Sequence, residues 1–340
     1  MSGISMRDLA EILGVSVASV SVALRGRSGI SEETRARILA EAHKRGYDMS
    51  RLSSKPSKGL IEIIDFSYQK VGMTIDQFSY YSQLIDAISS RLSDEGYEMS
   101  GPYNPNEASF PSRPKAVGAI LIGSMISDDE LQRFIKSKVP FVVAGNPMTY
   151  TPVNSVSHDN IGGISAAVNH LISFGHTRIG YIRLMCGAIG DERYRTFVQA
   201  LSDAGLSPEC LWDYSDKYSL AQLPDLSVLE ASLGDKPYPG TAVICDIDVI
   251  AMMFMRLMRD RGIIPGKDIS VIGFDDSPLA ALMEPPLTSV RTLEPQLGTS
   301  AVELLLSCIA NPHFKYRHIY IGTELVERAS TAPVSKNNEE

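Results

Sequence analysis

The sequence has few cysteines and no long apolar run, and these absences exclude several classes of protein. Its four cysteines are Cys186, Cys210, Cys245 and Cys308, which form no Cys-x-x-Cys pair. This spacing argues against a zinc site or a disulfide framework and is typical of a reducing cytoplasm. No apolar run reaches the roughly 18 residues that a membrane span needs, so we expect no membrane partner. The N-terminal run MSGISMRDLAEILG has early acidic residues and no apolar segment, so no secretory signal peptide is expected.

Motifs for catalysis and metal binding are also missing. The chain has no Gly-x-Ser-x-Gly elbow, no His-Glu-x-x-His, no P-loop and no Gly-x-Gly-x-x-Gly after a strand. Its six histidines are scattered without metal-ligand spacing. We therefore expect no enzyme, no cofactor and no metal.

Charge is distributed unevenly along the chain. The net charge is −8 overall, but residues 1–60 hold ten Lys and Arg against six Asp and Glu, which makes this part +4 and leaves −12 for the rest. A basic N-terminal part on an acidic body confines attraction for nucleic-acid phosphates to one end. An ordinary fluctuation of composition is the alternative.

The first 47 residues have the pattern of three short helices. Ser5 and Ser16 are suited to cap the first two helices, and Gly14 ends the first because glycine tolerates a left-handed turn. Ser31 caps a third helix that ends at Gly46, with an apolar stripe of Ile38, Leu39 and Ala42. Three helices with a tight glycine turn are typical of a helix-turn-helix, whose second helix enters the major groove. A helical cap that binds no nucleic acid is the alternative.

The run DLAEILGVSVASVSVALRGRSGISEETRARILAEAHKRGY resembles the head of the lactose-repressor (LacI/GalR) family of bacterial transcriptional regulators. By this resemblance, Val17 and Ala18 begin the recognition helix and contact bases. The positions that match contacts to the DNA backbone are Ser5, Ser16, Ser19, Ser21, Ser31 and Tyr47.

Two DNA-contacting positions depart from the family pattern. Val22 stands where the family usually has Arg, and Arg25 stands where it has Asn. Arg is the commonest reader of guanine, so its absence at position 22 predicts a changed base preference. We expect Arg25 or Arg27 to replace part of that contact.

Residues 48–58, DMSRLSSKPSK, are polar and form a predicted linker. In the family this stretch folds into a hinge helix on DNA and inserts a leucine into the minor groove. Here Pro56 takes the place of that leucine. Proline is tolerated only near a helix end, although it can act as an apolar wedge between base steps. Both a folded hinge and a looser tether remain open.

From residue 59 on, short apolar runs alternate with helical patterns. Strands are expected at 60–66, 116–124, 140–145, 178–184, 241–246 and 270–275. Helices are expected at 80–96, 126–138, 162–175, 191–205, 248–262 and 295–311. Buried strands separated by helices indicate parallel sheets built from βαβ units, and their number predicts two similar lobes. Ligands of such sheets bind at the carboxyl ends of the strands.

The family resemblance extends over this core. The segments that carry it are NSVSHDNIGGISAAVNHLISFGHTRIGYI, PGKDISVIGFDDSPLAALMEPPLTSVRTLEPQLGTSAVELLL and ELVERAST. The implied fold class is α/β: a three-helix helix-turn-helix followed by two Rossmann-like lobes of the periplasmic-binding-protein type (type I). The implied domains are a DNA-binding domain at 1–47, a linker at 48–58, an effector-binding and dimerisation core at 59–335 and a tail at 336–340. Lobe one would hold about 59–160 and 292–322, and lobe two about 161–291 and 323–333.

Six effector-binding candidates follow from strand ends and from the resemblance. They are Tyr80, Tyr81, Asn146, Asp159, Arg193 and Asp248. The two tyrosines match an aromatic pair at the start of the first core helix, Arg193 matches the Arg of an Arg-x-x-Gly-Phe motif, and Asp248 matches the Asp of an Asn-Asp pair. Some of these side chains could instead cap helices or fill the core. Asp275, Asp276 and His176 are interpreted as structural.

The sequence therefore predicts a sequence-specific transcriptional regulator, a repressor rather than an activator. It would bind a double-stranded DNA operator as a homodimer or tetramer in the cytoplasm. A small polar effector, a sugar or sugar derivative, would control its operator affinity, with a nucleobase or nucleoside as the alternative. The rival classes are a solute-binding protein, which would carry a signal peptide and no head, and an enzyme, which would need a nucleophile or metal cluster.

The departure at position 25 leads to a first prediction. Selection of bound duplexes from a random library should return an operator that differs from the family consensus. Arg25→Ala should weaken the preference for one base over the others at the contacted position by about tenfold, since one bidentate contact to guanine contributes roughly 1–3 kcal/mol. A consensus operator, together with an unchanged preference in the variant, would refute the idea.

Overall fold

The computed structural model describes most of the chain. The described residues are 4–24, 30–47, 57–66, 75–103, 116–123, 126–148, 151–183, 187–208, 211–213, 227, 230–231, 238–311, 313 and 315–334. Residues Met1–Lys58 and Gly59–Glu340 form two compact units, here called the head and the core. Arg25, Arg27 and most of the predicted linker, including Pro56, lie outside the described residues.

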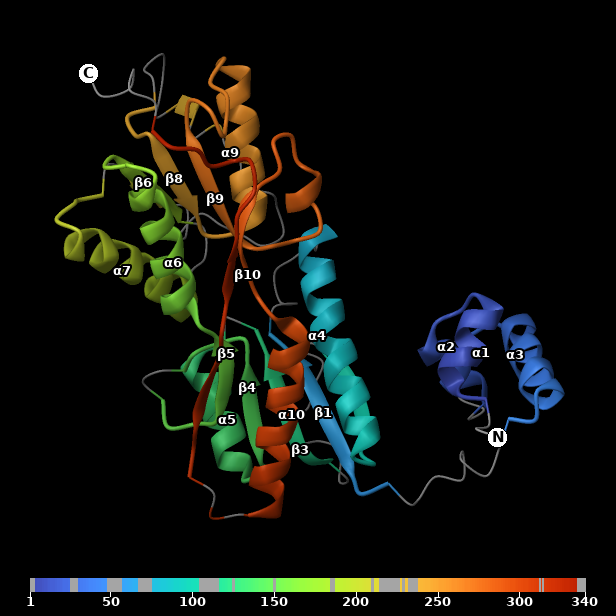
Figure 1. Ribbon diagram of the computed structural model, residues 1–340. Helices are drawn as coiled ribbons and strands as arrows, with labels where there is room; N and C mark the ends of the chain where they lie inside the picture. The colour runs from blue at the N-terminus through green and yellow to red at the C-terminus, as the bar shows by residue number, and fades with distance from the viewer. Residues whose placement is uncertain are drawn as a thin grey trace. The chain divides into compact units, whose positions relative to one another are not determined.

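The head contains the three predicted helices, α1 (Met6–Leu13), α2 (Val17–Leu24) and α3 (Glu32–Lys44) (Figure 1). Ser5 caps α1 as expected: its hydroxyl accepts the Asp8 N–H, and the Asp8 carboxylate accepts the Ser5 N–H at 2.8 Å. Gly14 ends α1 in the left-handed conformation, with φ 66°.

A small apolar cluster holds the three helices of the head together. Leu9 of α1, Val20 of α2 and Ile38 of α3 are almost fully buried in it. The predicted stripe on α3 was wrong for Leu39, which is 37% exposed. Helices pack through one narrow face in so small a domain, and Ile38 with Ala42 already fills the face of α3.

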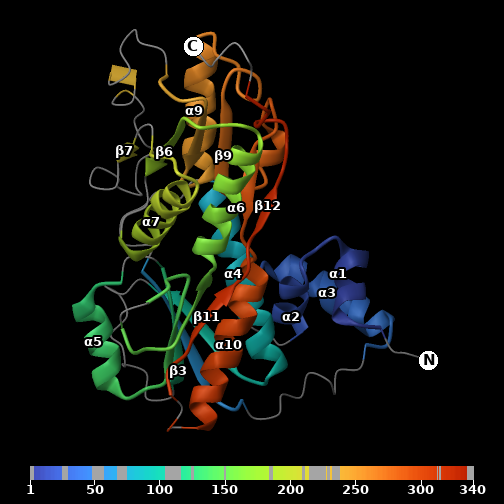
Figure 2. The same ribbon diagram turned by 60° about the vertical axis from the view of Figure 1, so that its left-hand side comes forward.

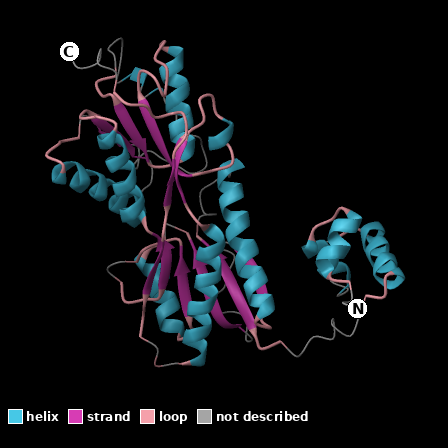
Figure 3. Cartoon of the chain, viewed as in Figure 1, coloured by secondary structure: helices cyan, strands magenta, loops and turns pink. Residues whose placement is uncertain are grey.

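The core contains two mainly parallel six-stranded sheets (Figures 1 and 3). The order in the first sheet is β11-β5-β4-β3-β1-β2, and all its strands are parallel. Its strands are β1 (Leu60–Asp65), β2 (Glu98–Tyr103), β3 (Ala116–Ile122), β4 (Phe141–Ala144), β5 (Ser155–His158) and β11 (His318–Ile321).

The order in the second sheet is β12-β10-β9-β8-β6-β7, with only β12 antiparallel. Its strands are β6 (Ile179–Arg183), β7 (Leu211–Asp213), β8 (Ala242–Cys245), β9 (Ser270–Asp275), β10 (Thr288–Arg291) and β12 (Glu324–Val326).

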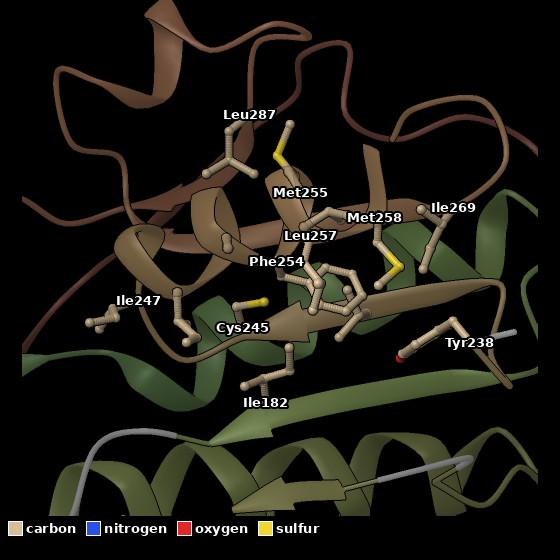
Figure 4. Close-up of a cluster of buried hydrophobic side chains, with 14 of the residues drawn as sticks. Ile182, Tyr238, Cys245, Ile247, Phe254, Met255, Leu257, Met258, Ile269 and Leu287 are labelled. Atoms are coloured by element: carbon tan, nitrogen blue, oxygen red, sulfur yellow. The ribbon is translucent and has the colours of Figure 1, made fainter. Parts of the chain in front are cut away.

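Helices cover both faces of each sheet and define two lobes. In lobe one, α4 (Ile75–Asp94) and α10 (Glu294–Ala310) lie side by side on one face, and α5 (Asp128–Ser137) covers the other (Figures 1 and 2). In lobe two, α6 (Asn160–Ser173) and α7 (Gly187–Asp203) cover one face, and α9 (Asp248–Asp260) covers the other. A 3-10 helix, η3 (Ala280–Leu282), follows β9. Phe254 and Met258 of α9 meet Cys245 of β8 in one buried cluster (Figure 4).

The chain crosses between the lobes at Asp159, at Thr292–Leu293 and at Gly322–Thr323. The first crossing continues from the carboxyl end of β5 into α6 of lobe two, and the second continues from the carboxyl end of β10 into α10 of lobe one. Since the other strands run parallel to β5 and β10, apart from β12, the carboxyl edge of each sheet faces the opposite lobe. This is the edge at which ligands of open α/β sheets bind.

The start of α6 packs closely against lobe two and the third crossing, which leads to a second prediction. A Cβ on Gly163 would lie 2.8 Å from Val290 Cγ1 and 2.9 Å from Thr323 Oγ1. Gly163→Ala should therefore lower the free energy of unfolding of the core by about 1–3 kcal/mol in denaturant titrations. Gly322→Ala is the control, because its Cβ would meet no atom within 4 Å. Equal stability of the two variants would contradict this packing.

Candidate functional site

The N-terminal end of α2 presents small side chains on the surface of the head. Ser16, Val17 and Ala18 are exposed, and Val17 keeps 44% of its surface accessible. The Ser16 hydroxyl accepts the Ser19 N–H at 3.0 Å and so caps the helix. Small exposed side chains allow the backbone of a helix to approach a groove closely, where base edges can be read.

The other predicted DNA-contacting residues in the described part of the head differ in their exposure to solvent. Ser5 and Ser31 are exposed at the N-termini of α1 and α3, while Ser21 and Val22 are half-buried. Tyr47 is only 7% exposed and packs in the head cluster. Its contact with a DNA backbone remains a prediction.

In the core, Arg193 of α7 is a deeply buried cation. It is 5% exposed, and its guanidinium carbon lies 3.6 Å from the centroid of the Phe274 ring at the end of β9. Its Nε donates to Asn160 Oδ1 at 2.8 Å, and its Nη1 donates to the carbonyl oxygen of Asp246 at 2.5 Å. A desolvated cation on an aromatic face is stabilised by the ring quadrupole.

Asp246 directly follows β8 at the same edge and is fully buried. Its carboxylate accepts a short hydrogen bond from the Tyr181 hydroxyl. Burial, together with the charge of Asp246, raises the pKa of Tyr181 well above its usual range. The hydroxyl therefore remains a hydrogen-bond donor at neutral pH.

Asp248 opens α9 and is 1% exposed. Its Oδ1 accepts from the Ser289 hydroxyl at 2.5 Å, and its Oδ2 accepts from the Ser277 N–H at 2.6 Å. Burial raises the pKa of this carboxyl to about 7, although both hydrogen bonds act in the opposite direction. These contacts brace the start of α9 against the loop after β9 and against β10. Its predicted contact with an effector remains a prediction.

On the lobe-one side, His158 ends β5 beside the first crossing and is buried. Burial and the charge of Arg193 lower the pKa of His158 to about 3, so the imidazole is neutral. The effect of the Arg193 charge on His158 shows that the end of β5 lies near α7 of lobe two. Asp159 caps α6 by accepting the Gly162 N–H at 2.8 Å, and the buried Asn146 accepts the Met148 N–H at 3.3 Å.

The expected position of the tyrosine pair was wrong. Helix α4 begins at Ile75, so Tyr80 and Tyr81 lie within the helix rather than at its start. Tyr81 packs against the apolar cluster of lobe one, and the side chain of Tyr80 lies outside the described residues.

Two of the residues interpreted as structural, His176 and Asp276, are held by internal contacts. His176 is buried, and its two ring nitrogens lie 2.9 Å from the hydroxyls of Thr241 and Ser270. Asp276 forms ion pairs with Arg291 at 2.7 Å and with Arg328 at 2.6 Å.

Two features are absent from the part of the chain that the structure describes. No helix there is long and apolar enough to cross a membrane. Within the same part of the chain, no group of three or more His, Cys, Asp or Glu side chains could hold a metal ion.

Two segments of the chain match known families. Residues 5–49 match the bacterial regulatory proteins of the lacI family, and residues 168–331 match the periplasmic binding protein-like domain. The transcriptional regulator MalR of Streptomyces coelicolor is 31% identical over 347 residues, covering 96% of each chain. The transcriptional repressor PurR of Mannheimia succiniciproducens is 25% identical, covering 97% of this chain and 99% of the relative.

Solved structures share the fold. The lac repressor dimer bound to operator and an anti-inducer aligns with a TM-score of 0.67 at 22% identity, over 97% of this chain and all of that one. The regulator CelR in complex with cellobiose aligns with a TM-score of 0.66 at 22% identity, over 96% of this chain and 99% of that one. The expected fold class is therefore confirmed.

Together these findings define a DNA-binding transcriptional regulator with a helix-turn-helix head and a two-lobed α/β core. The chain belongs to the lacI family of bacterial regulatory proteins. Like these relatives, it is a transcriptional regulator and not an enzyme.

Four residues around Arg193 were not among the predicted site residues. They are His158, Asn160, Tyr181 and Asp246. One signal was available, since Asp246 is the polar residue that ends a predicted strand. The roles of Asn160 and Tyr181 depend on side chains that approach only in the folded lobe.

The buried carboxyl of Asp248 leads to a third prediction, on pH dependence. Its pKa is raised from an ordinary 3.8 to about 7 in the folded protein. Its contribution to stability is therefore fully present below about pH 4 and is lost as the pH rises to about 7. The difference in free energy of unfolding between the wild type and Asp248→Asn should fall over this range and level off above it. Parallel pH profiles in denaturant titrations would contradict the raised pKa.

Proposed function

We propose that this regulator is a repressor that binds its operator as a homodimer in the cytoplasm. A sugar or sugar derivative held between the lobes would change its affinity for the operator. The observation that carries this proposal is the orientation of the sheets, whose carboxyl edges face each other and bring buried polar groups together. Parallel sheets bind small polar ligands at this edge.

The charges at these edges favour a neutral, hydroxyl-rich effector. Asp65, Asp246 and Asp275 lie at or next to the carboxyl ends of β1, β8 and β9. Arg183 and Arg291, at the carboxyl ends of β6 and β10, form ion pairs with carboxylates, whereas the Arg193 guanidinium donates to neutral oxygens. Carboxylates and a guanidinium hydrogen-bond well to hydroxyl groups, whereas an anionic effector would be repelled by the carboxylates. The CelR structure contains cellobiose, and a related regulator from Enterococcus faecium contains ribose.

We assign the polar contacts of the effector to Arg193 from lobe two and Asn146 from lobe one. Both are buried and lie at the facing edges. Val17 and Ala18 are assigned to the bases, because they are exposed at the N-terminal end of α2. The remaining predicted contacts of the head and the core remain predictions.

Repression and pairing are proposed from the relatives. PurR of Mannheimia succiniciproducens and CytR of Escherichia coli are named repressors, and the lac repressor was solved as a dimer on its operator. A two-fold dimer would place two heads on the half-sites of a near-palindromic operator. An effector shifts operator affinity only if it binds the two states of the core unequally.

A fourth prediction tests the effector class and the role of Arg193. Thermal unfolding of the full chain against panels of sugars and nucleosides should show stabilisation by a sugar, of about 2.7 kcal/mol at about 100 times Kd. Arg193→Lys should abolish this stabilisation, because a lysine cannot reproduce the planar fork of arginine.

The control is Arg195→Lys, because Arg195 lies on the same helix, its side chain is 62% exposed, and its guanidinium pairs with Asp191. Each variant is compared with its own ligand-free transition, so that any loss of stability in the variant is separated from loss of binding. Stabilisation by nucleosides alone would support the alternative effector. A sugar response that survives Arg193→Lys would exclude Arg193 from the site.

A further inference from the structure

The C-terminal end of α2 is held by a side chain of another helix. Arg35 Nη1 lies 3.5 Å from the carbonyl oxygen of Val22 and 3.5 Å from that of Ala23, both in the last turn of α2. The last carbonyls of a helix lack partners within the helix and carry partial negative charge. Helix α2 has no basic residue of its own in that turn. Among the described residues, the cation that complements this end comes from α3.

The backbone of Arg35 lies in the first turn of α3, which is held by several hydrogen bonds. Its N–H donates to the Ser31 carbonyl at 2.9 Å, and the Ser31 hydroxyl caps α3 by accepting the Thr34 N–H at 3.2 Å. One turn further on, Ile38 is buried in the head cluster. The base of the Arg35 side chain is thus fixed relative to the face of α2 that packs against α3.

The surroundings of the guanidinium direct it toward α2 rather than toward solvent. The Arg35 side chain is only 16% exposed. Its ion pair with Glu32, at 3.5 Å, involves a carboxylate that is 89% exposed. Water screens such a pair, which contributes little. The charge–dipole interaction with the last turn of α2 is less exposed and therefore stronger.

We propose that Arg35 is a positioning residue for sequence recognition. By holding the C-terminal end of α2, Arg35 fixes the angle at which Val17 and Ala18 meet the bases. This role rests on the proposed contact of Val17 and Ala18 with DNA. A helix of eight residues is marginal by itself, so loosening at one end reaches the other, about two turns away. Arg35 thereby sets the ratio of specific to non-specific affinity without contacting DNA.

The test uses the full chain and two labelled duplexes of equal length. One is the operator that the wild-type chain selects from a random library, and the other is a scrambled sequence. Arg35→Met keeps an apolar stem and removes the guanidinium, and Arg35→Lys keeps a cation. Arg37→Met is the matched control, because Arg37 lies on the same helix and is exposed. Affinities come from fluorescence anisotropy at several salt concentrations.

Arg35→Met should lower the operator affinity about tenfold. Its affinity for the scrambled duplex should stay within about twofold, and the slope of log affinity against log salt should be unchanged. Arg35→Lys should retain part of the operator preference, and Arg37→Met should leave the ratio of the two affinities unchanged.

Two results would overturn the proposal. One is an unchanged affinity ratio in Arg35→Met. The other is an equal loss on both duplexes with a salt slope shallower by about 0.9, which marks a direct phosphate contact. Should circular dichroism show that Arg35→Met unfolds the head, folded Arg35→Lys decides: a reduced ratio supports the proposal, and a wild-type ratio overturns it. If the wild-type chain selects no duplex, the DNA contact itself is wrong.

Discussion

The direction of two strands determines the arrangement of the core. Because β5 and β10 leave their sheets at their carboxyl ends and continue into the opposite lobe, every strand parallel to them ends toward that lobe as well. Polar side chains that follow a strand therefore gather where the lobes meet. Arg193, Asp246 and His158 come from distant parts of the sequence and interact there for this reason.

A buried charge needs compensation, and the way it is compensated here is informative. The hydrogen bonds of Arg193 go to the side-chain oxygen of Asn160 and the backbone carbonyl of Asp246, and the face of its guanidinium rests on the Phe274 ring. Neutral acceptors hold the guanidinium in place without neutralising its charge, as a carboxylate partner would. Asp248 shows the opposite arrangement, in which both oxygens are committed to internal donors and burial disfavours the charge. Of two charged residues that look equally promising in the sequence, Arg193 is held by neutral acceptors, whereas Asp248 braces a helix.

The sequence predicted the parts of the fold that have strong local patterns. The caps at Ser5 and Ser31 and the turn at Gly14 are encoded by neighbours a few residues apart, and β1, β3, β4, β6, β8 and β9 are apolar runs. Strand β5 was missed because three of its four residues, Ser155, Ser157 and His158, are polar, although all are buried. Strands β2 and β11 lie at the two edges of the first sheet and are only partly buried. Strand β2 contains Gly101 and Pro102, and β11 has only four residues, so neither stands out as a long apolar run. The partners of Arg193 could not be predicted, since they meet only through tertiary packing.

The hydrogen bonds at the crossings restrict how the two lobes can move. The Asp159 N–H donates to the Ile321 carbonyl at 2.8 Å, and the Thr323 hydroxyl donates to the Asp159 carbonyl at 3.1 Å. The first and third crossings are thereby joined into one double strap, while the second stands apart from these bonds. A strap of this kind resists stretching and sliding but yields to bending and torsion about its own axis. A rotation of one lobe against the other would therefore pivot at the strap, and a small torsion there would become a large displacement at the far rims of the sheets.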